Sequence, residues 1–398
     1  MDQKKFKAEV KWKVQRVKNL WHFVRAVWAV ARNGYPARKL TVIGVTGTDG
    51  KTTTCTLIYE ILKAAGYKTG LISTVSAKIG DEEIDTGFHT TNPDATLMQK
   101  IIARMVKEGV THLVLEVTAH GLDQYRVMGC NFYIGVLTNI THEHLDDFID
   151  MTRYQNTKLK LFKRVKYAVL NQDDPSYKMI NVKTIPYGKT KIRNIAEVLA
   201  GDYNKYNIGA AEAVVGILKV NKRLSDQVIK SFGGVPGRRE EVKAGQKFRV
   251  IVDFAHTPNA LEQVLKQLKK ELPENKKLIA VFGATGERDK TKRPMMGEAA
   301  SRLADVVIIT SDDTRMESQD EIAEQIMSGI NKRYSDKVIK INDRREAIRR
   351  AFKMAKAGDI VLIAGKGHEK TILIGKQDRP WSDAGVAREE IDKLRPIM

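Results

Sequence analysis

Cysteine, uninterrupted apolar runs near the N-terminus and acidic residues are all scarce in this 398-residue chain. Only Cys55 and Cys130 are present, and they lie far apart without metal-ligand spacing, which argues against a disulfide framework and against a zinc site. We therefore expect a reducing, cytoplasmic location. Charges interrupt every window of about 20 residues in the first 40, so that stretch is predicted not to span a membrane. It also lacks the apolar core and cleavage site of a signal peptide.

The deficit of acidic residues gives a net charge of +20, from 68 Lys and Arg against 48 Asp and Glu. Residues 1–40 hold eleven of the basic residues but only Asp2 and Glu9, so about nine of the surplus charges lie there. The same stretch carries Trp12, Trp21 and Trp28, which predicts a basic helix rich in aromatic residues. Such a helix suits an anionic membrane surface. A helix that packs its aromatic side chains on the rest of the protein is the alternative.

The length and composition predict two folded domains, because 398 residues can bury two ordinary cores and 42% of them are hydrophobic. After Pro36, short apolar runs alternate with helical stretches, which is typical of a parallel sheet covered by helices. The turn at 233–237 separates two such series and predicts a domain boundary near Gly237. The predicted strands are Leu40–Val45, His112–Val117, Ile134–Leu137, Tyr167–Leu170, Arg249–Val252, Leu278–Phe282, Val306–Ile309 and Ile360–Ile363. Two of the predicted helices are Asn259–Leu272 and Gln319–Tyr334.

The segment GVTGTDGKTTT at residues 44–54 is the strongest local signal. It follows a strand and opens a helix expected to reach about Ala65, so its backbone N–H groups would bind phosphates. Lys51 would reach the terminal phosphates, and the Thr52 hydroxyl would hold magnesium. Val45 stands where the generic loop has glycine, which makes this a variant loop. A glycine-rich turn without a ligand is the alternative.

A magnesium site also needs a carboxylate, and Glu116 ends the apolar run THLVLEV. A buried ionised carboxylate is costly unless it is paired, and magnesium would supply that pairing. A glutamate facing water at a strand edge is the alternative. His142 and His144 follow another apolar strand, among several acidic residues. Because open α/β sheets place ligands at their carboxyl edge, we expect Thr52, Glu116 and His144 to converge on one crevice.

Eleven motifs occur in one order over roughly residues 40–390, and together they resemble the Mur ligases of peptidoglycan synthesis. The branch they resemble most closely adds the third amino acid. The motifs are TGTDGKTT, HTTNPDA, LEVTAHGL, TNITHEHLDD, YQNTKLKLF, GDYNKYN, GRRE, VDFAHTPNAL, GERDKTKRP, TSDDTRMES and GKGHE.

The resemblance implies an α/β fold with a basic amphipathic N-terminal helix region (1–39), a central parallel-sheet ATPase domain (40–236) and a C-terminal Rossmann-like domain that binds an amino acid (237–398). It implies an ATP-dependent ligase that forms an acyl phosphate on a carboxylate and couples it to an amine. A diamino acid would be added to a muramyl peptide. The partners would be this acceptor and the amino acid, with no nucleic acid.

The resemblance also implies roles for individual residues. The catalytic group would be Lys51, Glu116, His144 and Lys158. Magnesium would be held by Thr52, Glu116, His144 and Lys158, the last as a carbamate formed from carbon dioxide. The ATP contacts would be Gly47, Thr48, Gly50, Lys51, Thr52, Thr53, Asn139, Asn204, Asn207, Arg238, Asp253 and His256.

The substrate contacts follow from the same resemblance. Thr90, Thr91 and His120 would bind the acceptor. The amino acid would meet Arg288, Asp312, Asp313, Arg315, Gly365 and Glu369. In that group, Arg315 could pair with a distal carboxylate and Glu369 with a distal amine, which suits diaminopimelate.

Three departures from the family pattern bear on the substrates. Only about 40 residues precede the phosphate loop, so we expect the family's N-terminal domain for the uridine nucleotide to be missing. In TSDDTR, Asp313 and Thr314 replace the Asn and Pro of the diaminopimelate-adding branch, and Ala119 replaces a usual Ser. A related ligase acting on another peptide or on a poly-amino acid, of the cyanophycin or polyglutamate kind, remains an alternative. So does a non-catalytic ATP-binding module.

Overall fold

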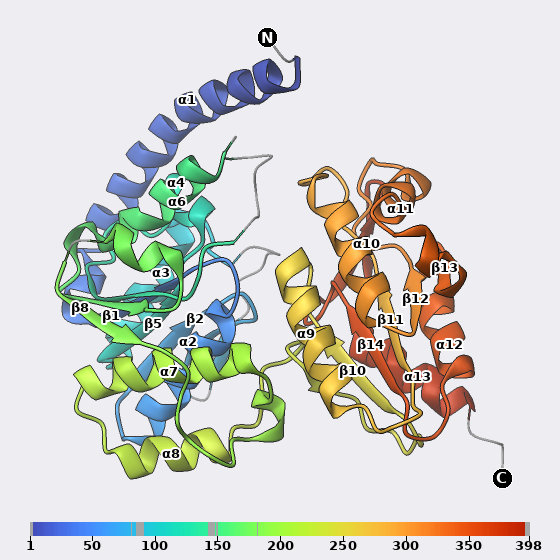
Figure 1. The fold of residues 1–398 in the computed structure, drawn as a ribbon. Coiled ribbons are helices and arrows are strands. Elements are labelled where there is room, and N and C mark those ends of the chain that lie inside the picture. Colours follow the sequence, from blue (N-terminus) through green and yellow to red (C-terminus); the bar gives the residue numbers. More distant parts are fainter. Residues whose placement is uncertain are drawn as a thin grey trace. The chain divides into compact units, whose positions relative to one another are not determined.

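The computed structural model describes residues 3–80, 82–84, 91–141, 148, 150–180 and 182–394, with side chains from Val14 onward. The chain divides into two compact units, Met1–Gly233 and Gly234–Met398 (Figure 1). Each unit has a mostly parallel sheet with helices packed against it, which confirms the predicted α/β class.

The first unit contains an eight-stranded sheet with the order β4-β3-β2-β5-β1-β6-β7-β8. Six of these strands are parallel, and β3 and β4 add an antiparallel edge. The strands are β1 (Thr41–Thr46), β2 (Thr69–Ile72), β3 (Ala77–Ile79), β4 (Glu82–Ile84), β5 (His112–Glu116), β6 (Phe132–Leu137), β7 (Tyr167–Asn171) and β8 (Thr184–Tyr187). The central strands are apolar because both of their faces are covered.

The helices of this unit bring polar side chains to the carboxyl edge of the sheet. They are α1 (Gln3–Arg32), α2 (Lys51–Ala64), α3 (Ala95–Lys107), α4 (Ala119–Asp123), α6 (Met151–Leu159), α7 (Asp202–Ile217) and α8 (Lys222–Lys230). Helix α2 starts directly after β1 and α4 soon after β5, so their first turns lie at that edge. Among the described residues, no helix combines the length and hydropathy needed to cross a bilayer.

The second unit contains a six-stranded sheet with the order β13-β12-β11-β14-β10-β9, in which only β9 is antiparallel. Its strands are β9 (Glu240–Glu241), β10 (Arg249–Asp253), β11 (Leu278–Phe282), β12 (Val306–Ile309), β13 (Val338–Lys340) and β14 (Ile360–Ala364), followed by the hairpin β15 (Thr371–Ile374) and β16 (Gln377–Pro380). Its helices are α9 (Pro258–Glu271), α10 (Lys292–Leu303), α11 (Gln319–Met327), α12 (Arg344–Met354) and α13 (Asp383–Leu394). Two apolar clusters use alternate residues of these strands and so form cores on the two faces of the sheet.

The predicted strands agree with the observed ones to within two residues, whereas the helix predicted over Gln319–Tyr334 is wrong in length. It ends at Met327 and is followed by a separate short helix, Lys332–Lys337. At Gly329 a Cβ atom would lie 1.8 Å from the carbonyl oxygen of Pro294, so the chain passes α10 where only glycine fits. The Asn331 side chain then caps the short helix by accepting from the Arg333 amide.

Candidate active site

Glycines at two positions shape the loop between β1 and α2. Gly47 has φ +148° and Gly50 has φ +84°, conformations that side chains disfavour. A Cβ atom would lie 1.8 Å from Thr138 Oγ1 at Gly47, and 2.2 Å from Asn207 Oδ1 at Gly50. The loop backbone therefore lies directly against polar groups from β6 and α7, and the first turn of α2 follows at once.

The segment after β6 fixes this loop through hydrogen bonds to its backbone. Thr138 Oγ1 donates to the Asp49 carbonyl at 2.7 Å, and Asn139 Oδ1 accepts from the Asp49 amide at 2.9 Å. The Thr48 amide donates to the Asn139 carbonyl at 2.9 Å, and Thr48 Oγ1 accepts from the Thr141 amide at 3.0 Å. Asn139, predicted as an ATP contact, thus positions the phosphate loop.

Thr52 and Glu116 meet at the carboxyl edge, as the sequence predicted from their strand ends. Thr52 Oγ1 donates to Glu116 Oε1 at 3.2 Å, and the Thr74 amide donates to Glu116 Oε2 at 2.9 Å. Only 1% of Glu116 is exposed. A buried carboxylate beside a hydroxyl in the first turn of a helix is a donor set that magnesium accepts.

Two lysines reach the same loop. Lys51 Nζ donates to the Thr48 carbonyl at 2.6 Å, and Lys158 Nζ donates to the Gly47 carbonyl at 2.6 Å. Lys158 is 2% exposed, and its ammonium lies 4.5 Å from the centre of the Tyr154 ring. Since lysine is rarely buried, Lys158 is not the solvated helix-surface cation that its sequence context alone favoured. His144 lies outside the described residues.

The start of α7 brings two buried amides to the beginning of α2. Asn207 Oδ1 accepts from Thr54 Oγ1 at 3.4 Å, and Asn207 Nδ2 donates to Asn204 Oδ1 at 2.9 Å. Thr53 is buried in the same helical turn of α2 as Thr52. Both asparagines therefore lie next to the phosphate loop, while their contact with adenine stays a prediction.

Thr91 and His120 are the predicted acceptor residues that the structure describes, and Thr91 lies near Glu116. Thr91 Oγ1 is 2.8 Å from Thr74 Oγ1, in the segment whose amide contacts Glu116. His120 is in the first turn of α4, with its ring centre 5.2 Å from that of Phe148. Thr90 lies outside the described residues.

Asn92 and Arg126 were not singled out from the sequence, yet they join this group. Asn92 Nδ2 donates to the Glu116 carbonyl at 2.7 Å, and its Oδ1 accepts from the amide and the hydroxyl of Thr118, each at 2.9 Å. Arg126 Nη1 donates to the Asn92 carbonyl at 2.6 Å, and burial lowers the pKa of Arg126. A single arginine in a loop carries no sequence pattern, so only the fold reveals it.

In the second unit, the predicted nucleotide residues gather at the carboxyl end of β10. Asp253 Oδ2 accepts from the Arg239 amide at 2.7 Å. Burial raises the pKa of Asp253, against the opposing charge of Arg238. The Arg238 guanidinium lies 4.4 Å from the centre of the Phe254 ring, and the ring of His256 lies 4.5 Å from the same centre.

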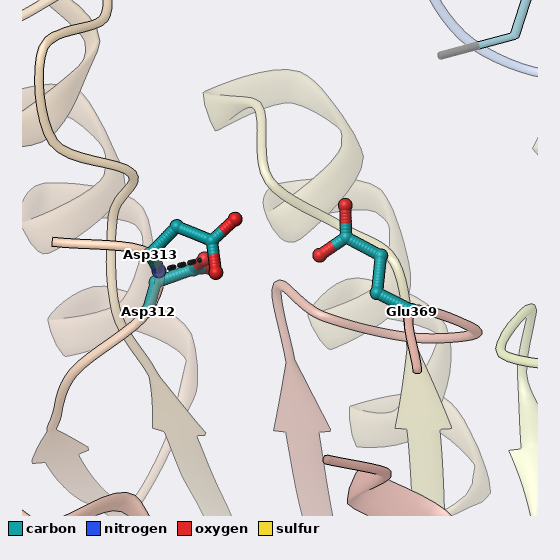
Figure 2. Close-up of side chains that lie close together, drawn as sticks. All are labelled: Asp312, Asp313 and Glu369. Atoms are coloured by element: carbon teal, nitrogen blue, oxygen red, sulfur yellow. Dashed lines mark hydrogen bonds between the residues drawn. The ribbon is translucent and has the colours of Figure 1, made fainter. Parts of the chain in front are cut away.

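Three carboxylates predicted to bind the amino acid lie together beyond β12 and β14 (Figure 2). Oxygens of Asp312, Asp313 and Glu369 lie within 4.8 Å of one another. Lys366, which is fully buried, contacts Asp313 Oδ1 at 2.6 Å and also pairs with Glu369. At Gly365, with φ +114°, a Cβ atom would lie 2.7 Å from Asp312 Oδ2, so this glycine lets the two segments approach.

The protonation of these carboxylates is shaped in opposite directions. Burial works against ionisation of Asp312, but the charges of Lys366 and Arg344 outweigh it and lower the pKa of Asp312. Burial raises the pKa of Glu369, despite its contact with Lys366. The pKa values of Asp312 and Glu369 are thus shifted in opposite directions, although the charge of Lys366 favours ionisation of both.

Of the two predicted arginines, Arg315 is next to this cluster in the sequence and Arg288 lies in another loop. Arg315 has φ +53°, and its amide donates to the Leu373 carbonyl at 3.2 Å, which ties the segment after Asp313 to the β15 hairpin. Arg288 is half-buried in the segment between β11 and α10.

Comparisons with known proteins match both units. Family models of the Mur ligase middle domain and of the Mur ligase glutamate ligase domain match residues 45–197 and 237–367. The UDP-N-acetylmuramoyl-L-alanyl-D-glutamate--2,6-diaminopimelate ligase of Bacillus cereus is 39% identical, over 94% of this chain and 82% of its own length. The UDP-N-acetylmuramyl-tripeptide synthetase of Roseiflexus sp. is 36% identical, over 92% and 81%.

Solved structures agree with this. A structure of a UDP-N-acetylmuramoyl-L-alanyl-D-glutamate--2,6-diaminopimelate ligase is 32% identical with a TM-score of 0.58, and the match covers 89% of this chain and 78% of that one. A folylpolyglutamate synthase of Mycobacterium tuberculosis shares the fold at 15% identity, with a TM-score of 0.71 and coverage of 98% and 99%.

Proposed function

Because the chain belongs to the Mur ligase family, whose members are ATP-dependent amide ligases, we propose that it adds diaminopimelate or a related diamino acid to a muramyl peptide. The family and the ligase activity predicted from the sequence are confirmed. The proposed substrates are those that appear in the names of relatives that are 36–39% identical to the chain over the aligned residues. The observation that carries the proposal is the contact of Thr52 with Glu116, beside a phosphate loop that also holds Lys158.

We propose that Thr52 and Glu116 hold magnesium, together with His144. Their donor set fits, since a buried carboxylate and a hydroxyl already point at each other in the first turn of α2. Bound magnesium would supply positive charge on the transferring phosphoryl group. Lys51 and the amides of the loop would bind the same group, and Asn139 would keep the loop in place.

We also propose that Lys158 carries a carbamate. Burial favours the neutral form of an amine, which is the form that attacks carbon dioxide. An N–C bond forms, one proton leaves the nitrogen, and the product is an anionic oxygen ligand. Lys158 suits this chemistry because it is buried at Gly47, where an oxygen ligand would face the phosphate loop.

The reaction then proceeds in two steps. An acceptor carboxylate oxygen attacks the γ-phosphorus of ATP, ADP leaves, and the acceptor becomes an acyl phosphate. The amine attacks the acyl carbon, loses a proton and displaces phosphate, which leaves an amide. Lys51 would offset the charge that builds on the transferring oxygens, and Thr91, His120 and Asn92 would orient the acceptor beside Glu116.

The acidic cluster and Arg315 favour different incoming amino acids. A neutral amide at position 313 would not repel the distal carboxylate of a diamino acid, but the negative charge of Asp313 would. Together with Asp312 and Glu369, Asp313 favours an ammonium group instead. A diamino acid without the distal carboxylate is therefore a second candidate. Arg315 favours diaminopimelate, because an arginine can bind the distal carboxylate of this amino acid with two hydrogen bonds.

The test is the mass of the product. The purified protein is incubated with ATP, magnesium, a muramyl dipeptide and an equimolar mixture of amino acids, and phosphate release is followed in parallel. We expect a product heavier by diaminopimelate less one water, with one phosphate released per amide. A mass gain of another diamino acid would support the second candidate. Product only with a polyglutamate or cyanophycin acceptor, or phosphate release that needs no amine, would contradict the proposal.

We further propose that residues 1–40 bind an anionic membrane surface. In α1, Trp21 and Trp28 are 63% and 53% exposed, and the surrounding stretch carries the basic surplus. Tryptophan suits the interface of a bilayer, and basic residues suit its anionic headgroups. Sedimentation with anionic vesicles should decrease as salt rises, because salt screens such attraction. Binding that ignores salt and headgroup charge would contradict this.

A further inference from the structure

From Val14 onward, where the side chains of α1 are described, the helix has one apolar face that is buried and another that is exposed. Ala26 and Ala29 are fully buried, and the helix packs along α3 (Figure 1). The other face exposes large apolar side chains: Val14, Val17, Leu20, Trp21, Val24, Val27 and Trp28. Positions 14, 17, 21, 24 and 28 recur every three or four residues, so they form one continuous stripe along the helix.

The covered face of α1 is attached to the elements that carry the predicted acceptor site. Asn19 Nδ2 donates to Asp123 Oδ2 at 2.7 Å, at the end of α4. The Phe23 ring packs edge-on against Tyr125, with centres 5.2 Å apart. Arg25 lies 3.6 Å from Asp94, the residue that caps α3.

From these contacts a continuous chain leads to the candidate metal carboxylate. Phe23 in α1 packs against Tyr125, and Arg126 is the next residue along the chain. Arg126 donates to the Asn92 carbonyl at 2.6 Å, and Asn92 donates to the Glu116 carbonyl at 2.7 Å. If α1 binds a surface, these contacts would keep the predicted acceptor site at a fixed distance from that surface.

The charge of this region selects a lipid surface over a second copy of the chain. Residues 1–40 carry a surplus of nine positive charges, and Lys18 and Arg32 are exposed along the described part of α1. Two such helices packed stripe to stripe would bring like charges together. Anionic headgroups would instead neutralise them while the tryptophans enter the interface.

We infer that the acceptor is itself anchored in the anionic lipid surface that α1 binds, so that the enzyme extends a peptide presented at the membrane. This deepens the proposed function and rests on it. The acceptor would be a muramyl peptide joined to an apolar chain, and α1 would act as a positioning element through Asp123, Arg126 and Asn92.

The test compares one acceptor peptide in two forms, free in solution and attached to a lipid in vesicles. For the anchored form, we expect kcat/KM to be about tenfold or more higher in anionic vesicles than in phosphatidylcholine vesicles, because only the former concentrate the enzyme at the surface. The double variant Val17→Glu, Val24→Glu should lose this preference and the vesicle binding, yet keep the wild-type rate on the free peptide. The double variant Met179→Glu, Met295→Glu, which adds the same two negative charges at exposed apolar side chains outside α1, should keep both the preference and the vesicle binding.

Equal kcat/KM for the anchored peptide in both kinds of vesicle would overturn the inference. So would a dimer in light scattering that the double variant dissociates without any loss of vesicle binding, because the stripe would then be a contact between copies. Turnover of the free peptide with no gain from anchoring refutes the inference alone. Turnover of neither peptide refutes the proposed function as well, so the two failures can be told apart.

Discussion

Replacing Lys158 by alanine tests the carbamate, because it removes a buried side chain whose only charged atom lies at the phosphate loop. Nζ is 2.6 Å from the Gly47 carbonyl and 4.5 Å from the centre of the Tyr154 ring. Loss of the oxygen ligand should lower kcat by about a hundredfold to a thousandfold, which corresponds to roughly 3–4 kcal/mol of transition-state stabilisation. The cavity left behind should cost about 2 kcal/mol of unfolding free energy, so the variant should still fold.

That cavity also provides a rescue experiment. Formate or acetate should enter it and restore part of the phosphate release, because each supplies the carboxylate that the carbamate would have provided. Wild-type enzyme in ¹³C-labelled bicarbonate should show a carbamate carbon in its NMR spectrum, and Lys158→Ala should not. Lys163→Ala, which removes an exposed lysine nearby, is the matched control and should keep full activity and the signal. Full turnover of Lys158→Ala, or a labelled carbon that persists in it, would refute the assignment.

Three further predictions address other sites. Lys51→Ala should lower kcat by about a thousandfold or more, because the charge on the transferring phosphoryl group would lose a counter-ion. Lys63→Ala, at the far end of α2, is the control and should leave kcat unchanged. Wild-type rates in Lys51→Ala would contradict the role of Lys51. Asp313→Asn should raise kcat/KM for diaminopimelate relative to lysine by about fivefold or more, as it removes a negative charge from the side-chain pocket, and an unchanged ratio in a competition assay would count against the site. Hydrogen bonds from the buried Arg293 lower the pKa of Glu317 to about 2. Glu317→Gln should therefore reduce the unfolding free energy by up to about 2–3 kcal/mol above pH 4.5, and the difference from wild type should vanish as pH falls toward 2. Denaturant titrations that show the same difference at every pH would contradict this linkage.

Much of the first unit's site was predictable because it depends on strand ends. The apolar runs before Thr46 and Glu116 are buried on both faces and therefore stand out in the sequence. Carboxyl ends of neighbouring parallel strands meet at one edge, and β1 pairs with β5 in the observed register. The contact between Thr52 and Glu116 follows from that pairing together with the start of α2 at Lys51, shortly after β1 ends at Thr46.

Other features depend on contacts between distant segments and leave no local pattern. Arg126 is positioned by its hydrogen bond to the carbonyl of Asn92, which lies 34 residues earlier in the chain. Neither residue lies in a helix or strand, so neither belongs to a periodic pattern. The antiparallel edge formed by β3 and β4 is too short to be recognised as strands. For α1, the composition could not decide between packing and exposure, and the structure shows that the helix does both on opposite faces.

A buried ion pair fixes the two segments that carry the acidic cluster of the second unit. Arg344 binds Asp383 through two hydrogen bonds of 2.8 and 2.6 Å, and it also donates to the carbonyls of Ser311 and Ala364. Those carbonyls directly precede Asp312 and Gly365, so a pair with no net charge fixes the ends of both segments.

Within the described part of the chain, Lys366 forms ion pairs with both Asp313 and Glu369, so one cation faces a cluster of three carboxylates. Burial raises the pKa of Glu369, and the nearby charge of Lys366 does not fully offset this effect. A ligand ammonium would supply the missing positive charge, and binding it would lower the pKa of Glu369 again. We therefore expect the cluster to favour an incoming amino acid with a second amino group, whichever acceptor the first unit holds.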